Sequence, residues 1–437
     1  MAHAQMQSGQ TPSDPMPAGQ MQMGQMQMPM GGPVDTLTAN VLRHMGSGTS
    51  LEPDSSAPPM LMRMSGSWME MLHGQASLVE QQQSGPRGHD KFFSVNWVMG
   101  MVRKSTSHGQ WTFRAMLSME PATITGRYYP ELFQQGETAF GRPIVDGQHP
   151  HNLFMELAGI YDEKIGENSV LTLYAAPVGD PALGPEAFPH RMSAESDPLA
   201  PLAHHLQDST HIAYDVITGG VTVHRTRVEA SGFHGREPGE NRWIITAGAI
   251  DSWSARVSAA LARDWMAQYS LGHLHSPEAL HPEEDVLRQT ASVSFHHAWF
   301  ARDRSDHDRS AHVSPAADLD ATAIWGRNHT IGTNENANGY LLEAEARIHE
   351  RHSIWTRIEN DDRTTDLLGS AAPPAETVIG RVQAYTGGYA HRIFSNRWSV
   401  YELGAQPTLY NTPAPLRSLY GDHPVGVAAV LNIHLGN

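Results

Sequence analysis

Short segments of alternating apolar and polar residues follow one another from about residue 67 to the end of the chain. In WTFRAMLSME at 111–120, Trp111 and Phe113 fall on one side of an extended chain, and Thr112 and Arg114 on the other. A period of two is typical of a β-strand with two different faces. We count about fourteen such segments, separated by clusters of Gly, Asp, Asn and Pro. The chain is therefore predicted to be all-β, with antiparallel strands.

Two architectures suit such strands: a soluble sandwich that buries the apolar face, and a membrane barrel that turns it to lipid. The apolar face here is thin and rich in Ala and Gly, and Trp or Tyr recurs near segment ends. These aromatic residues are Trp111, Trp243, Trp253, Trp265, Trp299, Trp398, Tyr401 and Tyr410. Because they resemble an aromatic girdle, we favour a transmembrane β-barrel of about fourteen strands. Its lumen should be lined by charged residues, among them Arg256, Glu343, Glu345, Arg347 and Arg381.

Residues 1–60 differ from the rest because they are rich in Met, Gln, Pro, Gly and Ser and show no sustained period. This composition predicts a disordered arm that precedes a barrel at residues 61–437. Within the arm, MQMGQMQMPM at 21–30 offers five thioethers, which are soft ligands that suit Cu(I). The candidate ligands are Met21, Met23, Met26, Met28 and Met30. The alternative is a low-complexity linker that happens to be rich in Met and Gln.

Composition limits the partners that the protein can bind and the cellular compartment in which it is expected. The chain of 437 residues has a formal net charge of -16, and lysine occurs only at Lys91, Lys104 and Lys164, so nucleic acid is not expected as a partner. It has no cysteine, which fits the oxidising periplasm or cell surface. No stretch approaches the roughly 20 apolar residues of a transmembrane helix. The small residues in AHAQ at 2–5 resemble the remnant of a signal-peptide cleavage site.

A histidine-rich region interrupts the alternation at 121–211, where we expect one long, partly helical insertion. The spacing of Leu153, Leu157 and Ile160 predicts a short helix within it. Imidazoles bind Cu(II), Zn or Ni, and a carboxylate such as Asp208 can complete or orient a site. The candidate ligands are His149, His151, His204, His205 and His211. Two alternatives remain open: these are ordinary hydrogen-bonded loop residues, or the insertion is a plug inside the barrel.

A Met-rich N-terminal arm followed by an amphipathic strand pattern resembles copper-resistance protein B, an outer-membrane component of bacterial copper-resistance systems. The resemblance is carried by MQMGQMQMPM and by the strand pattern of the remaining chain. It implies copper binding or export across the outer membrane, with no catalytic residues. Of its site residues, only the methionines of the arm can be transferred.

Catalysis is not expected, although some outer-membrane barrels hydrolyse lipids. The chain has no G-x-S-x-G motif, and the proximity of Ser, His and Asp in HHLQDST says little, because triads form through tertiary structure. The Gly-rich stretch EASGFHGREPGENRW lacks the phosphate-binding P-loop pattern and is predicted to be a loop between strands.

The predicted function is copper binding, resistance or export by an outer-membrane barrel whose arm captures metal in the periplasm. Expected partners are outer-membrane lipid, copper ions and a periplasmic copper protein. The alternative is a passive outer-membrane pore or structural barrel without metal specificity, and a lipid hydrolase ranks third.

Overall fold

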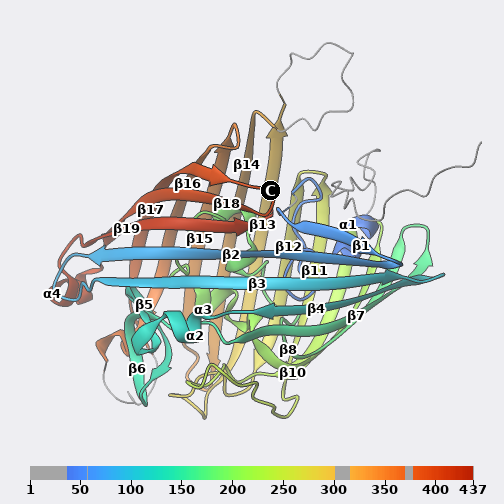
Figure 1. Cartoon of the computed structure of the whole chain (residues 1–437). Helices are drawn as coiled ribbons and strands as arrows, with labels where there is room; N and C mark the ends of the chain where they lie inside the picture. The colour runs from blue at the N-terminus through green and yellow to red at the C-terminus, as the bar shows by residue number, and fades with distance from the viewer. Residues whose placement is uncertain (1–36, 57, 301–314, 370–376, 437) are drawn as a thin grey trace, which may run out of the picture. The chain divides into compact units, whose positions relative to one another are not determined.

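Sixteen antiparallel strands close into a barrel (Figure 1). The computed structural model describes residues 37–56, 58–300, 315–369 and 377–436. Each wall strand pairs with the next along the chain, and β4 pairs directly with β7. The wall strands are β2 Trp68–Gln83, β3 Lys91–Ser105, β4 Gly109–Leu117, β7 Phe154–Gly166, β8 Ser169–Gly179, β9 Ala213–Val223, β10 Thr226–His234, β11 Ser252–Ala262, β12 Trp265–Leu274, β13 Asp285–Trp299, β14 Ala317–Ile331, β15 Asn336–Ile348, β16 His352–Thr364, β17 Val378–Ser395, β18 Ser399–Asn411 and β19 Val425–Leu435. The predicted antiparallel barrel is confirmed, with two strands more than we counted.

The remaining described elements are short. They are α1 Thr38–Arg43, β1 Leu61–Ser65, α2 Glu120–Thr123, η1 Thr125–Arg127, β5 Tyr129–Ala139, β6 Arg142–Gln148, η2 Phe188–His190, η3 Met192–Ala194, α3 His204–Gln207, η4 Ser209–His211, η5 Thr365–Leu368, η6 Ala414–Leu416 and α4 Arg417–Tyr420. Strands β5 and β6 form a separate two-stranded hairpin. Among the described residues, no helix combines the length and the apolar character needed to cross a bilayer.

The first and last wall strands close the barrel by pairing with each other. Strand β19 pairs with β2 from Gly426 opposite Gln83 to Leu435 opposite Gly74. Beyond that point β1 takes the place of β19, with Leu61 opposite Leu72. Because β19 and β1 together cover the edge of β2, its backbone groups find partners on that side.

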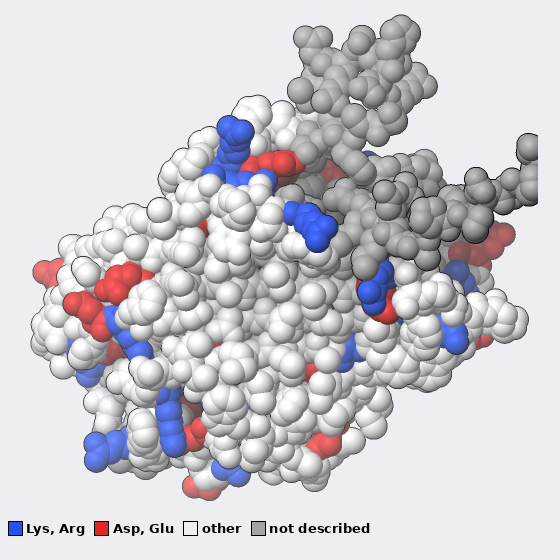
Figure 2. Space-filling model, in the orientation of Figure 1, with Lys and Arg blue, Asp and Glu red and all other residues white. Residues whose placement is uncertain are grey.

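The two faces of the wall are reversed relative to a soluble protein. On β15, Leu342 points outward and is 47% exposed, whereas its neighbour Glu343 points into the lumen and is 1% exposed. Large apolar residues recur on the outer face, including Val257, Ile358 and Leu403. In Figure 2 the middle of the visible face carries few charged side chains, which gather towards its ends. This distribution is the one expected of a barrel in lipid.

Most of the predicted inward charges lie in the lumen. Arg256 and Glu345 are buried there, and Arg347 forms ion pairs with Asp320 and Glu195. The prediction is wrong for Arg381, which is exposed on the outer side of β17 and pairs with Asp362. The two faces of β17 are exchanged relative to the expectation because its inward residues Val382 and Ala384 belong to an apolar cluster in the lumen, to which β5 contributes Leu132 and Phe133.

Several of the predicted girdle residues are exposed near the ends of wall strands. Trp243 and Trp253 are exposed in or next to the connection 235–251, and four others lie at the opposite rim. Trp111, Trp265, Trp299 and Trp398 are exposed and lie within a few residues of the turns at this end. Tyr410 departs from the prediction, since it is buried in the lumen against Phe133. Amphipathic rings favour the boundary between lipid and water, so this girdle marks one edge of the apolar band.

The two rims of the barrel carry links of different lengths. At the short-turn rim, the six junctions between wall strands that the structure describes in full have only two or three residues, at 106–108, 167–168, 224–225, 263–264, 349–351 and 396–398. The long-loop rim carries the two longest connections, a first insertion at 118–153 and a second insertion at 180–212. In Figure 1, α1 lies near one end of the barrel and α4 at the other.

Segments from both rims enter the lumen. The N-terminal segment 37–56 enters from the short-turn rim, where the Leu37 amide donates to the His224 carbonyl. It meets the second insertion where Ser47 Oγ bonds Asp180 at 2.7 Å and the Ser47 amide donates to Glu186 at 2.7 Å. Arg114 of the wall donates to the carbonyls of Gly46 and Gly48. The lumen is therefore filled by the chain itself.

Two sequence predictions require correction here. Residues 38–43 of the expected disordered arm form α1, and residues 37–56 pack inside the barrel because their polar groups match the charged wall. The expected single insertion at 121–211 is two, because β7 and β8 cross the wall between them. The predicted helix around Leu153, Leu157 and Ile160 is largely β7, where Ile160 is an inward, buried residue.

Candidate metal centre in the lumen

The second insertion crosses the lumen in short helical turns. Prolines divide it and prevent a longer helix, because a helix-interior proline lacks the amide donor and clashes with the preceding turn. These prolines are Pro181, Pro185, Pro189, Pro198 and Pro201. The resulting η2, η3, α3 and η4 bring several histidines and carboxylates to the barrel interior.

Buried ion pairs fix the second insertion to the wall. Arg191 bonds Glu343 of β15 at 2.6 Å and Asp208 at 2.7 Å. Arg357 of β16 contacts the same Glu343 at 3.3 Å and Asp197 of the insertion at 3.1 Å. Removing one partner from such a network leaves an uncompensated buried charge, which is strongly destabilising. The insertion therefore holds a defined position relative to the wall.

All five histidines predicted from the sequence lie together in the lumen. We name this group the histidine centre: His149 and His151 from the first insertion, and His204, His205 and His211 from the second. The ring centroid of His204 lies 5.1 Å from that of His205, 5.3 Å from His211 and 6.3 Å from His149. The rings of His151 and His211 are 5.4 Å apart. The two insertions are thus joined at a cluster of imidazoles.

Three of these histidines can offer ligand atoms to one ion. One ring nitrogen each of His149, His204 and His205 lies within 4.8 Å of the other two. Zinc–imidazole bonds of about 2.0–2.1 Å require ligand nitrogens to approach one another more closely than this, so binding would draw the rings inward. His149 also lies 3.0 Å from Glu137, which adds a carboxylate beside the trio.

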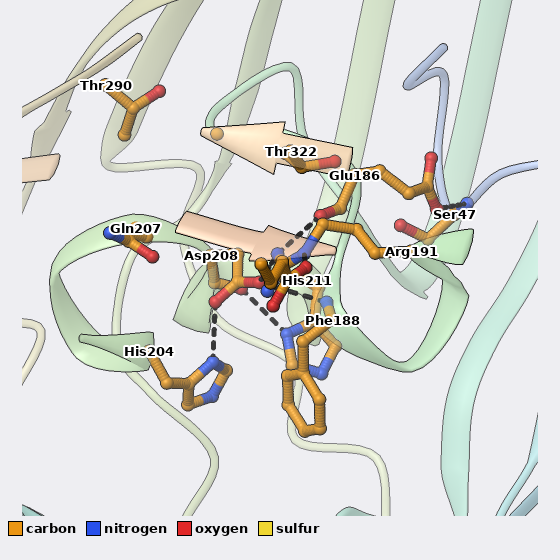
Figure 3. Close-up of polar contacts among 12 residues, drawn as sticks. Ser47, Glu186, Phe188, Arg191, His204, Gln207, Asp208, His211, Thr290 and Thr322 are labelled. Atoms are coloured by element: carbon orange, nitrogen blue, oxygen red, sulfur yellow. Dashed lines mark hydrogen bonds and ion pairs between the residues drawn. The ribbon is translucent and has the colours of Figure 1, made fainter. Parts of the chain in front are cut away.

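Carboxylates orient the rings of the histidine centre. His204 Nδ1 lies 2.7 Å from Asp208, and His151 Nδ1 lies 2.9 Å from Glu120. His211 Nδ1 donates to the Asp208 carbonyl at 2.7 Å, and its Nε2 is buried without a hydrogen-bond partner among the described residues. Figure 3 shows His204, His211 and Arg191 converging on Asp208. Carboxylates that hold one ring nitrogen and leave the other unprotonated are typical of metal-binding histidines.

Burial favours the neutral form of three of these imidazoles, those of His149, His204 and His211. Burial lowers the pKa of His204 to about 4 and outweighs the opposing effect of Asp208. Burial also lowers the pKa values of His149 and His211. For Asp208 burial alone would raise the pKa, but Arg191 and His204 hold it well below its usual range. Neutral imidazole is the form that binds a metal.

The sequence did not reveal every member of this region. Glu120 and Glu137 were not identified as site residues, because their partners lie 31 residues and 12 residues away and no motif links them. Arg191 was missed as the anchor of Asp208 for the same reason. The methionines Met21, Met23, Met26, Met28 and Met30 lie outside the described residues, so the copper arm stays a prediction.

The fold is similar to solved outer-membrane barrels at very low sequence identity. An anion-selective porin from Comamonas acidovorans is 10% identical, with a TM-score of 0.49, over 84% of this chain and 99% of the porin. OmpF of Salmonella typhi in complex with daunomycin is 8% identical, with a TM-score of 0.46, over 85% and 99%. The outer-membrane channel DcaP of Acinetobacter baumannii is 8% identical, with a TM-score of 0.41, over 85% and 99%. At these values the likenesses do not indicate a shared activity.

No protein-family model matches the chain, and no curated protein sequence matches it. The resemblance to copper-resistance protein B therefore receives no support from these comparisons.

Proposed function

We propose that this chain is an outer-membrane β-barrel whose lumen is closed to large solutes by its own segments. The observation that carries the proposal is that the barrel wall exposes its apolar side chains and buries its charged ones, as Leu342 and Glu343 do on one strand. A surface band of large apolar residues is costly in water, whereas lipid accepts it. The band supports a barrel in the membrane. Because the resemblance to copper-resistance protein B received no support, we take the passive or structural barrel as the primary interpretation.

The different lengths of the connections at the two rims support one orientation of the barrel in the membrane. Outer-membrane barrels have short periplasmic turns and longer extracellular loops. The short-turn rim also receives the N-terminal segment, and β19 ends there. We therefore place the short-turn rim in the periplasm and the two insertions on the extracellular side.

The filled lumen limits transport. Porins of 16–18 strands leave an aqueous channel when their interior is not occupied. Here Arg256 of the wall reaches Thr49 of the N-terminal segment, and Glu345 accepts hydrogen bonds from Ser196 of the second insertion. Because these contacts cross the interior, we propose that the barrel conducts far less than an open porin.

Reconstitution tests this proposal. The purified full chain should float with phospholipid vesicles, and unheated samples should migrate differently from boiled ones in detergent electrophoresis, because a closed barrel resists the detergent. In planar bilayers its unitary conductance should be far below that of an open porin of equal strand number. A chain that stays soluble without detergent would contradict the membrane assignment, and porin-sized conductance would contradict the closed lumen.

A second candidate function is transition-metal binding at the histidine centre, favoured by the approach of His149, His204 and His205. The probe is Co(II), whose visible absorption changes on binding imidazole, followed by competition with Cu(II) and Zn(II). His204→Gln should abolish the absorption, whereas His108→Gln, in an exposed turn, should preserve it. Equal spectra for the two variants would reject this site.

A further inference from the structure

The lumen face of β2, β3 and β4 carries sulfur where most of the wall carries oxygen or nitrogen. In register, His73 of β2 is opposite Met99 of β3, and Met99 is opposite Met116 of β4. We name Met99 and Met116 the thioether row, and His73 lies at its end. Side chains directly opposite in antiparallel strands have Cβ atoms about 4.5–5.5 Å apart, so the three meet on one face. All three are buried, with Met99 at 0% exposure.

A parallel row of methionines lies beside it. Met62 of β1 is opposite Met71 of β2, and Met71 is opposite Met101 of β3. Met71, Met99, Met101, Met116 and Met155 belong to one buried cluster, against which Met60, Met62 and Met69 also pack. Methionine is a common filler of irregular cores, so this cluster alone does not identify a ligand.

Two imidazoles next to the thioether row distinguish it from ordinary methionine packing. His190 of η2 reaches the wall and places Nε2 3.2 Å from the sulfur of Met116. Its ring centroid lies 5.7 Å from that of His73, and both rings contact Trp97, at 4.4 Å and 5.1 Å. His73 Nε2 is buried and has no hydrogen-bond partner among the described residues. Burying a polar nitrogen without a partner is costly, so its position requires an explanation beyond packing.

We propose that Met99, Met116, His73 and His190 form a Cu(I) site on the lumen wall, separate from the histidine centre. Thioether sulfur is a soft donor that needs no deprotonation, and Cu(I) is the soft cation that such donors select. Imidazole nitrogen completes the set, and Cu(I) is satisfied by few ligands. Carboxylates dominate hard-cation sites, and none is required here.

The surroundings of His190 suit this role. Its Nε2 already contacts the sulfur of Met116, and its ring packs against Trp97 close to His73. Phe188, two residues earlier on η2, packs its ring against those of His151 and His211. The short η2 turn therefore joins the thioether row to the histidine centre. A Cu(I) ion on the wall would thus lie next to the centre without depending on it.

Cu(I) stoichiometry in the purified full chain tests the site. The background is a full-length variant with Met21, Met23, Met26, Met28 and Met30 changed to Leu, so that the stretch 21–30 contributes no thioether ligands. In this background Met99→Leu/Met116→Leu should bind about one equivalent of Cu(I) less, measured by competition with a chromogenic Cu(I) chelator. Leucine keeps the bulk of methionine and removes its sulfur. Met266→Leu, a buried lumen methionine in another cluster, is the matched control and should lose nothing.

Methyl NMR tests the Cu(I) site even if the double variant fails to fold. The background protein is labelled at methionine methyl groups and titrated with Ag(I), a redox-inert substitute for Cu(I). The signals of Met99 and Met116, assigned through single leucine variants, should shift together at about one equivalent, with Met266 unchanged. Unperturbed Met99 and Met116 signals, or equal losses for Met266→Leu, would reject the site. His204→Gln should leave these shifts intact, and the measurement in detergent micelles does not depend on membrane location.

Discussion

Leu342 lies near the middle of β15, where the outer face should contact the centre of the bilayer. Leu342→Arg should lower the free energy of unfolding by about 2–4 kcal/mol in lipid vesicles, because a charge there must leave water. Leu342→Ala, which shortens the side chain without adding charge, should cost less. Denaturant titration in vesicles measures both. Equal stability of the Arg variant and the wild type would indicate that this face is exposed to water.

Three carboxyl groups make the junction between the N-terminal segment and the second insertion sensitive to pH. Burial raises the pKa of Asp180 to about 8 and also raises the pKa values of Glu52 and Glu186. Because unfolded carboxyls titrate near pH 4, the folded junction binds protons more tightly and is most stable at acidic pH. Its stability should fall as pH rises from about 4 through about 8.

Hydrogen exchange measures this effect. Amides of residues 37–56, corrected for the intrinsic exchange rate, should lose protection several-fold between pH 5 and pH 9. Glu186→Gln should flatten the dependence, because it removes one titrating group and keeps a polar partner for Ser47. Protection that increases with pH would contradict the prediction.

At the residue scale, the sequence predicted which residues form the candidate site better than it predicted which side of the wall a side chain faces. The candidate histidines were selected by residue type, and the structure brings them together because they border the two insertions. Arg381 was misplaced, because a two-residue period gives the faces of a strand and does not say which one is inward. Packing against Tyr410 and other lumen residues decides that point.

At the scale of elements, residues 37–56 are tied to the wall by buried hydrogen bonds. Removing residues 37–56 together with the preceding arm should lower the thermal transition by several degrees. The reason is that Arg114 loses the carbonyls of Gly46 and Gly48, and His44 loses its 2.6 Å contact with Asp162. Removing residues 1–36 alone should leave the transition unchanged. Calorimetry of the two truncated chains in detergent measures the difference, and equal transitions would contradict it.

The arm itself retains the prediction made from its composition. An excised peptide of residues 21–30 should bind Cu(I) under reducing conditions through two to four thioethers and should bind Zn(II) poorly. Replacing its five methionines with leucine should abolish Cu(I) binding while keeping bulk and hydrophobicity. Unchanged affinity in that peptide would favour the low-complexity linker.

The elements missed from the sequence share one physical cause. Strand β7 resembles a helix in sequence because its lumen face includes Met155, Ala158 and Ile160 along with charged residues, which blurs the period of two. The N-terminal segment shows no period because its partners are polar residues of the wall and of the second insertion that are distant along the chain. Local patterns cannot report such partners.

At the scale of the whole molecule, the barrel class was predictable because lipid imposes the same alternation on every wall strand. The number of strands was underestimated because β7 and β8 were assigned to the insertion. Closure of the lumen was one of three alternatives for the histidine-rich region. The contacts that select this alternative join residues far apart in the chain. Arg191 and Glu343, for example, are 152 residues apart.

The position of the lumen segments along the chain has a consequence for the order of assembly. The N-terminal segment and both insertions all precede β9, whereas the barrel closes only when β19 reaches β2, a pairing of very high contact order. The interior is thus synthesised before eleven of the sixteen wall strands. A chain that closed first would have to thread polar segments through a finished ring. We therefore expect the strands from β9 onwards to fold around an interior that is already assembled, with the seam between β2 and β19 forming last.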